Sequence, residues 1–214
     1  TELLGAKNIG VIVNRNGLIV AGINYSVVVG EISIALGLSG LVLIEAEIAP
    51  IREHSPDLPV TINMMFEFYE LNYHDIANAI DIASWDAYPE WHSTGDDGKI
   101  ASETAFWHDF YRTLKGRPFL LMESTPSLVN WKPYNKLKRP GLDVLSSLQA
   151  VAHGSDSVQY FQWRKSRGSS EKLHGAVVGH DGTANTRVFR SVQKTGEILK
   201  SIDEVAGTVT NVKV

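Results

Sequence analysis

The chain of 214 residues has 43% hydrophobic and 21% charged residues, which is typical of a globular protein long enough to build a hydrophobic core without covalent cross-links. Its net charge of −4 offers no basic surface for a polyanion, so the composition argues against a nucleic-acid partner. Because the sequence contains no cysteine, disulfides, thiol nucleophiles and cysteine-ligated metals are excluded.

The N-terminal region contains a long apolar run, residues 17–44, which is long enough to cross a bilayer. Glu31 lies in its middle, however, and a charge at that depth costs ~2.5 kcal/mol or more on insertion scales. The many Ile and Val residues and the interspersed glycines favour buried strands over a membrane span. The chain also lacks the basic segment and cleavage pattern of a secretory signal at its start, and we expect a cytoplasmic protein.

From about residue 41 onward, apolar runs of strand length alternate with stretches of helical spacing. The expected strands cover 60–65, 82–88, 119–124 and 157–164. The expected helices cover 45–54, 73–80, 102–115, 142–153 and 185–205, with Ser102 as N-cap and Gly116 as terminator of the third, and a polar loop covers 165–183. Continuous apolar strands are typical of a parallel sheet buried on both faces, so the pattern predicts an α/β fold. Four such units amount to half of an eight-stranded barrel and would leave two exposed sheet edges.

In β/α barrels the functional groups gather at the carboxyl ends of the strands. Here those ends, and the loops behind them, carry carboxylates for acid–base or nucleophilic chemistry and aromatic rings that can stack on the C–H faces of a sugar. The set comprises Asn63, Glu67, Trp85, Asp86, Tyr88, Glu123, Trp131, Trp163, Arg164, Arg167, Glu171, His174 and His180. No HExxH or comparable spacing occurs, and neither a metal nor another cofactor is expected.

Glu123 is the strongest single candidate. It ends the apolar run FLLMES, and the sequence Ser-Thr-Pro forms a turn directly after it. A strand-end carboxylate could simply cap that turn, but its position on a rigid element next to a turn where a ligand would lie favours a nucleophile. Trp131, seven residues beyond Ser124, could line a ligand or be a packing residue.

The remaining candidates also have structural alternatives. Glu171 and His174 lie three residues apart and share a face if their loop contains a helical turn, but they could instead form an exposed salt pair. Arg167 belongs to a basic loop that could simply be solvated. Three residues near the end of the second expected strand could line a site or anchor the core: Trp85, Asp86 and Tyr88.

Four long segments, SWDAYPEWH, PFLLMESTPSLVNW, FQWRKSRGSSEKLHGAVVGHDG and NTRVFRSVQKTGEIL, make the chain resemble the family 42 glycoside hydrolases, the microbial β-galactosidases. The resemblance begins at about residue 41. It implies a (β/α)8 TIM-type barrel, of which 41–207 would supply strands five to eight, while 208–214 would begin the linker strand to a trimerisation domain and 1–40 stay unassigned. It also implies Glu123 as the nucleophile, Trp131 as a wall of the galactose subsite, and Glu171 with His174 as contacts to sugar hydroxyls.

The implied mechanism is retaining, in which one carboxylate attacks the anomeric carbon while a second acid protonates the leaving oxygen. In the family this acid is the Glu of an Asn-Glu pair on the fourth strand, and no Asn-Glu pair occurs in the 214 residues. We therefore expect the chain by itself to have little or no activity on a terminal β-D-galactosyl oligosaccharide. The resemblance further implies a homotrimer for the full-length enzyme. Three alternatives stay open: an α-L-arabinopyranoside substrate, an inactive sugar-binding remnant, and a membrane-anchored fragment.

Overall fold

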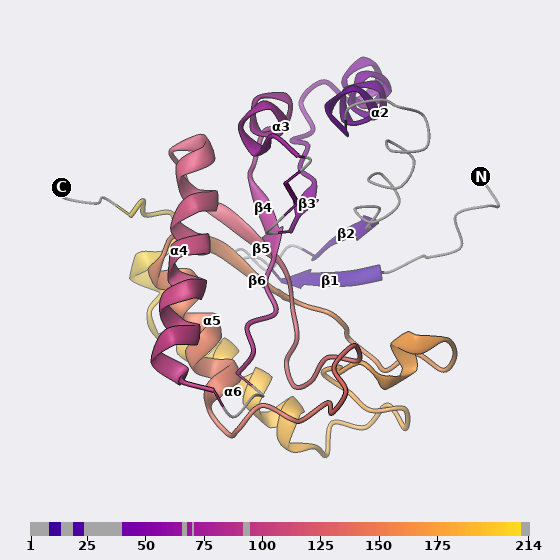
Figure 1. Ribbon diagram of the computed structural model, residues 1–214, viewed down its shortest axis with the longest axis vertical. Coiled ribbons are helices and arrows are strands. Elements are labelled where there is room, and N and C mark those ends of the chain that lie inside the picture. Colours follow the sequence, from indigo (N-terminus) through magenta and orange to yellow (C-terminus); the bar gives the residue numbers. More distant parts are fainter. Residues whose placement is uncertain are drawn as a thin grey trace.

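The computed structural model describes residues 9–13, 19–23, 40–65, 68–69, 71–91 and 95–210. Its centre is a parallel sheet of four strands in the order β3-β4-β5-β6. The strands are β3 (Asn63–Met64), β4 (Ser84–Asp86), β5 (Phe119–Ser124) and β6 (Ser155–Tyr160). The helices that follow them are α3 (Tyr73–Ala79), α4 (Asp97–Lys115), α5 (Leu142–Ala152) and α6 (Arg187–Ser201) (Figure 1). Each parallel pair is thus connected through a helix, which confirms the predicted α/β fold.

Two further elements come before the sheet. The strands β1 (Ile9–Val13) and β2 (Ile19–Ile23) pair antiparallel, and β1 lies beside β6. Helix α2 (Gly40–His54) follows and begins five residues before the expected start. Residues 19–23 of the apolar run therefore form a strand, as expected, whereas residues 40–44 form the first turn of α2 and not a strand. Residues 24–39, with Glu31, lie outside the described residues. In the described part of the chain, we find no helix that combines the length and apolarity needed to cross a bilayer.

Helix α4 begins at Asp97, whereas the sequence predicted Ser102 as its N-cap. The side chain of Asp96 accepts a hydrogen bond from the N–H of Gly98 at 2.8 Å and caps the helix instead. Ser102 lies one turn inside, where its hydroxyl donates to the carbonyl of Gly98. The predicted end is confirmed, because Gly116 has a φ of 61°, in the left-handed region that glycine adopts without strain.

Strand β6 is shorter at its end than predicted. It begins at Ser155 and ends at Tyr160, so Trp163 and Arg164 lie beyond the sheet. The residue after the strand is still hydrogen-bonded to β5, because the N–H of Phe161 donates to the carbonyl of Ser124 at 2.8 Å. The expected polar loop then follows and contains a single 3-10 turn, η1 (Ser170–Leu173). The last predicted helix is divided into α6 and a short 3-10 turn, η2 (Asp203–Val205).

The hydrophobic core lies between the sheet and the helices on its outer face. Trp85, on β4, is 2% exposed and stacks on Tyr111 of α4, with ring centroids 4.9 Å apart. It also makes an edge contact with His108, whose ring in turn stacks on Phe119. Aromatic pairs of this kind contribute about 0.5–1.5 kcal/mol each beyond the area that they bury. Of the two interpretations left open for Trp85, the structure supports the core anchor.

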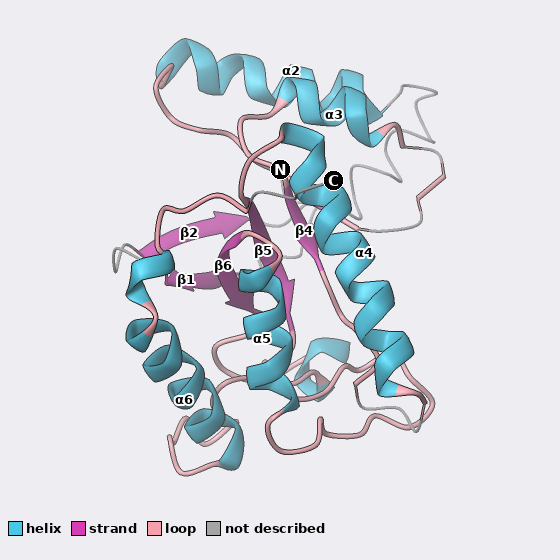
Figure 2. Cartoon of the chain, turned by 90° about the vertical axis from the view of Figure 1, so that its left-hand side faces the viewer, coloured by secondary structure: helices cyan, strands magenta, loops and turns pink. Residues whose placement is uncertain are grey.

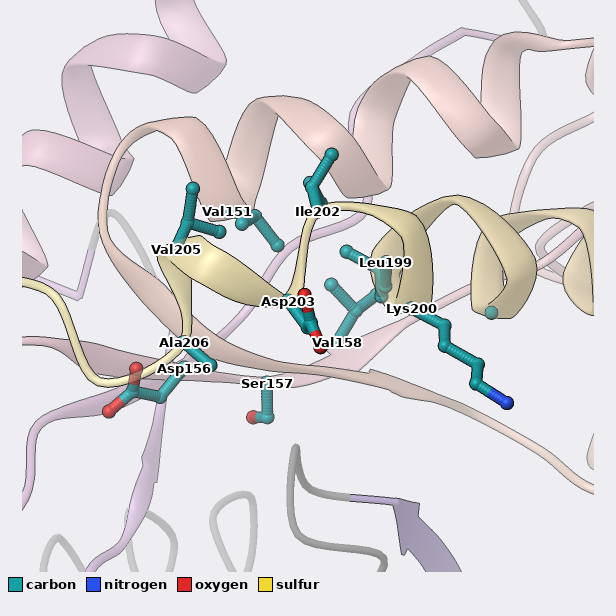
Figure 3. A pocket seen from close by; sticks show the side chains of 11 residues that line it. Val151, Asp156, Ser157, Val158, Leu199, Lys200, Ile202, Asp203, Val205 and Ala206 are labelled. Atoms are coloured by element: carbon teal, nitrogen blue, oxygen red, sulfur yellow. The ribbon is translucent and has the colours of Figure 1, made fainter.

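The two ends of the sheet differ in character. The loops that follow the carboxyl ends of the strands gather at one end, on the side away from α2 and α3 (Figure 2). A cavity of about 360 Å³ lies instead among the first half of β6, the end of α5 and the end of α6 (Figure 3). Its walls are mostly apolar, with Val151, Val158 and Leu199 among them. Because functional groups of β/α folds gather at the carboxyl ends of strands, this cavity is not the candidate site.

Candidate active site

A bulge in β5 determines the direction of Glu123. Along the β4–β5 pair, Trp85 is opposite Leu121, and the register then shifts so that Asp86 is opposite Glu123. Side chains alternate between the faces of a strand, so without the shift Glu123 would share the helix-facing side of Leu121. The additional residue moves Glu123 to the face of Asp86. Bulges next to active sites commonly redirect a side chain in this way.

Tyr88 holds the carboxylate of Glu123. Its hydroxyl donates to Oε2 of Glu123 at 2.6 Å, a distance typical of a charge-assisted O–H···O bond. Burial, and next the negative charge of Glu123, raise the pKa of Tyr88 well above its ordinary value, so the phenol keeps its proton. Tyr88 therefore acts as a hydrogen-bond donor that orients the carboxylate.

The rings of Trp131 and His174 lie against the ring of Tyr88, and the ring of Phe161 lies against His174. The ring of Trp131 lies 5.0 Å from that of Tyr88 in an edge contact and 5.6 Å from the imidazole of His174. The imidazole is also 5.8 Å from Tyr88 and 4.9 Å from Phe161. Trp131 remains 53% exposed, so much of its surface is available to a ligand. The structure thus brings Trp131, His174 and Tyr88 together near Glu123, although they come from three different loops.

The turn η1 presents the pair Glu171 and His174. His174 is 1% exposed, and its Nδ1 lies 3.0 Å from the carbonyl oxygen of Gly175. A carbonyl only accepts, so Nδ1 carries the proton and Nε2 is an acceptor. Nε2 of His174 and Oε2 of Glu171 are both buried, and neither has a hydrogen-bond partner in the described part of the chain. Such atoms are expensive to bury unless a ligand completes their bonding.

Burial changes the proton affinity of both groups. It raises the pKa of Glu171 and lowers the pKa of His174, so each is shifted towards its neutral form. No ion pair joins them among the described residues. The exposed salt pair, which was the structural alternative for these two residues, is therefore wrong.

Asp86 is a second carboxyl beside Glu123. It is 2% exposed, and the side-chain amide of Asn63 donates to its Oδ2 at 2.7 Å. Its Oδ1 is buried without a hydrogen-bond partner among the residues that the structure describes. Burial, and next the charge of Glu123, raise the pKa of Asp86 well above its usual range. The charge of the neighbouring Glu123 thus favours the protonated form of Asp86, as a like charge at close range does.

Other sequence candidates lie elsewhere. Trp163 is 49% exposed and contacts Phe189, and Arg164 donates to the carbonyl of His180. Arg167 is exposed, and its role stays a prediction. Glu67 lies outside the described residues. Among the described residues, no three His, Asp or Glu side chains are grouped so that they could hold a metal ion.

Sequence reasoning missed two residues that the structure places around the site. Phe161 contacts His174, and its position directly after an apolar strand was the available signal. Lys138 is buried at the end of the loop that carries Trp131. No signal could have found it, because it lies in NKLKRPG, among other basic residues that are exposed.

The comparison with protein families decides what this arrangement belongs to. Residues 40–202 match the model of the family 42 glycoside hydrolases, described as β-galactosidase. The chain belongs to this family. Among curated relatives, it is 53% identical to β-galactosidase GalA of Bacillus licheniformis over 170 residues, which are 76% of this chain and 25% of the relative. It is 57% identical to β-galactosidase Pbg of Clostridium perfringens over 162 residues, 74% of this chain and 24% of the relative.

Solved structures agree with this assignment. A cold-adapted β-galactosidase of Rahnella sp. superposes with a TM-score of 0.76 at 55% identity, over 79% of this chain and 25% of that one. A family 42 β-galactosidase of G. stearothermophilus superposes with a TM-score of 0.77 at 48% identity, over 81% of this chain and 26% of that one. The four-stranded sheet is therefore part of a TIM-type barrel, and the chain spans about a quarter of the length of these relatives.

Proposed function

We propose that this chain carries the nucleophile half of a retaining β-galactosidase, with Glu123 as the nucleophile. The observation that carries the proposal is the redirected Glu123 carboxylate, oriented by the hydroxyl of Tyr88 at the carboxyl end of β5. A relative from G. stearothermophilus has been solved as a catalytic mutant in which a glutamate is replaced, so a glutamate is catalytic there.

In the proposed first step, a carboxylate oxygen of Glu123 forms a bond to the anomeric carbon as the bond to the leaving oxygen breaks. Tyr88 fixes the orientation of the attacking group, which lowers the entropic cost of reaching the reactive geometry. Trp131 offers an exposed aromatic face for the C–H surface of the sugar. The buried acceptors of Glu171 and His174 would each accept a hydrogen bond from a sugar hydroxyl.

The proton donor is the part of the mechanism that this sequence lacks. A retaining site needs a second carboxyl about 5–5.5 Å from the nucleophile. The family places it in an Asn-Glu pair, which is absent from residues 1–214. We therefore propose that the chain alone turns over natural galactosides poorly, whereas a substrate with a leaving group that needs no protonation can still react with Glu123.

The finer features stay predictions. The relatives are named β-galactosidases, which supports a terminal β-D-galactosyl substrate over the α-L-arabinopyranoside alternative. A homotrimer, a cytoplasmic location, and a linker strand at 208–214 follow only from the resemblance or from the sequence.

The test is covalent labelling with a 2-deoxy-2-fluoro-β-galactoside that carries a dinitrophenyl leaving group. The fluorine slows hydrolysis of the intermediate, and the good leaving group makes a general acid unnecessary. We expect one galactosyl mass on the peptide that contains Glu123. Binding without labelling would instead support the sugar-binding remnant, and a label on another carboxylate would contradict the assignment.

A further inference from the structure

A buried lysine closes the loop that carries Trp131. Lys138 is 2% exposed, and its Nζ donates to the carbonyl oxygen of Thr125 at 2.7 Å. Its backbone N–H donates to the carbonyl of Ser127 at 2.8 Å. Thr125 follows Glu123 by two residues, so these bonds join the two ends of the loop 125–138 next to the nucleophile. Trp131 lies midway along that loop.

The surroundings of Lys138 connect several elements. Asp143, in the first turn of α5, is 2% exposed and attracts the ammonium group. Arg187, at the start of α6, donates to the backbone carbonyl of Lys138 at 3.0 Å. Tyr160, at the end of β6, bonds to Ser147 of α5 and lies within the field of Asp143. Asp143 is therefore the charged group that acts on the ammonium, Arg187 bonds to the backbone of Lys138, and Tyr160 shares the field of Asp143.

Packing alone does not explain a lysine at this position. Removing an ammonium group from water is costly, and an apolar side chain of similar length, such as methionine, would fill the space without that cost. What the ammonium adds is a charge-assisted hydrogen bond to one specific carbonyl, at about twice the strength of a neutral bond. That carbonyl belongs to the first residue of the loop.

We propose that Lys138 is a positioning residue for the sugar site, whose ammonium group ties the carbonyl of Thr125 to the far end of the loop 125–138 and thereby fixes the loop that presents Trp131. The assignment of Trp131 as a sugar platform rests on the proposed function, but the tie itself does not. When the ammonium loses its proton, the amine keeps N–H donors but loses the assistance of charge and the attraction of Asp143, and the loop loosens.

Lys138 loses its proton within a pH range in which the folded chain can be studied. Burial lowers the pKa of Lys138 to about 8, and Asp143 opposes the shift. The groups that touch Trp131 titrate elsewhere: the pKa of His174 is lowered from 6.5, and that of Tyr88 is raised above 10. A transition near pH 8 at Trp131 therefore identifies Lys138.

The direction in which the free energy of unfolding changes with pH distinguishes loosening of the loop from general unfolding. The unfolded chain keeps the lysine proton up to about pH 10.4, so between about pH 8 and pH 10.4 it binds more protons than the folded chain. The contribution of Lys138 to the free energy of unfolding thus rises with pH in this window. The loop loosens there although the fold does not weaken on account of this group.

The experiment follows the indole N–H resonance of Trp131, identified by its loss in Trp131→Phe, from about pH 6 to about pH 10. We expect a shift with a midpoint near 8 in the wild-type chain and no such shift in Lys138→Met. Lys138→Arg, which keeps its charge, should hold the low-pH position throughout. Lys136→Met removes an exposed lysine from the same loop and should leave the titration unchanged.

Two outcomes would overturn the proposal: a wild-type resonance that does not titrate near pH 8, or a titration that survives in Lys138→Met. If Lys138→Met does not fold, the wild-type chain still provides a test, because the hydrogen-exchange protection factor of the Lys138 amide should fall across the same midpoint. The readouts also separate the two proposals, since failure of covalent labelling at Glu123 leaves the titration of the loop unaffected.

Discussion

On β4 and β5, one face carries residues of the hydrophobic core and the other carries residues of the candidate site. Trp85 and Leu121 face the helices, are each 2% exposed, and belong to the hydrophobic core. Asp86 and Glu123 come one and two residues later and lie side by side on the other face, where a bulge has redirected the glutamate. A step of one residue on β4 and of two residues on β5 therefore separates residues that stabilise the fold from residues that can carry the chemistry. Substitutions on the two faces should fail in different ways.

The largest effect is expected from Glu123→Gln. Glutamine keeps the shape and can still accept the hydrogen bond of Tyr88, but it lacks the carboxylate that attacks, so the labelling rate should fall by roughly 10⁴-fold or more. The midpoint of urea unfolding should hardly change. Glu103→Gln, an exposed glutamate on α4, serves as the control with unchanged labelling. Equal labelling of the Glu123→Gln chain would remove Glu123 from the mechanism.

On the helix-facing side, Trp85→Ala should cost about 3–5 kcal/mol of unfolding free energy, because it leaves a cavity beside Tyr111 and His108. Trp131→Ala removes the same side chain from a half-exposed position and should cost about 1 kcal/mol or less. Urea unfolding followed by circular dichroism measures both. Similar losses in the two variants would show that the faces do not differ as described.

Some features of these two faces can be predicted from the sequence, and others cannot. The strands and their parallel order follow from apolar runs, and α4 ends at Gly116 as expected. The direction of Glu123 does not follow, because strict alternation from Leu121 would point it towards the helices and nothing in FLLMES marks the bulge. Nor does the burial of His174, since its loop reads as polar and only contacts with distant rings enclose it. Contacts of this kind depend on tertiary structure, which local patterns do not contain.

An intermediate effect is expected from Tyr88→Phe. The variant removes only the hydroxyl that donates to Glu123 at 2.6 Å, and the ring contacts with Trp131 and His174 remain. Loss of the orienting bond should slow labelling by roughly 10–100-fold, since a hydrogen bond to a charged group contributes about 1.5–3 kcal/mol. Tyr134→Phe, which alters an 83% exposed tyrosine, provides the control. A labelling rate within twofold of wild type would show that Tyr88 packs beside the nucleophile without orienting it.

The last effect concerns the pH dependence of stability, because Asp86 is a carboxyl buried on the face of the site. Its pKa in the folded chain is raised above the unfolded value of about 3.9, so the unfolded chain loses this proton first as the pH rises. The contribution of Asp86 to stability is thus fully present below about pH 4 and declines at higher pH, by at most about 1.4 kcal/mol per pH unit, until the folded-state pKa is passed.

Asp86→Asn, which keeps an oxygen for the amide of Asn63 but cannot ionise, should lack this decline. Urea midpoints of both chains at about pH 4.5 and about pH 7 measure the difference, with the exposed Asp57→Asn as control. An identical pH dependence in wild type and Asp86→Asn would mean that Asp86 is ionised beside Glu123, and the two carboxyls would then need a cation or solvent between them.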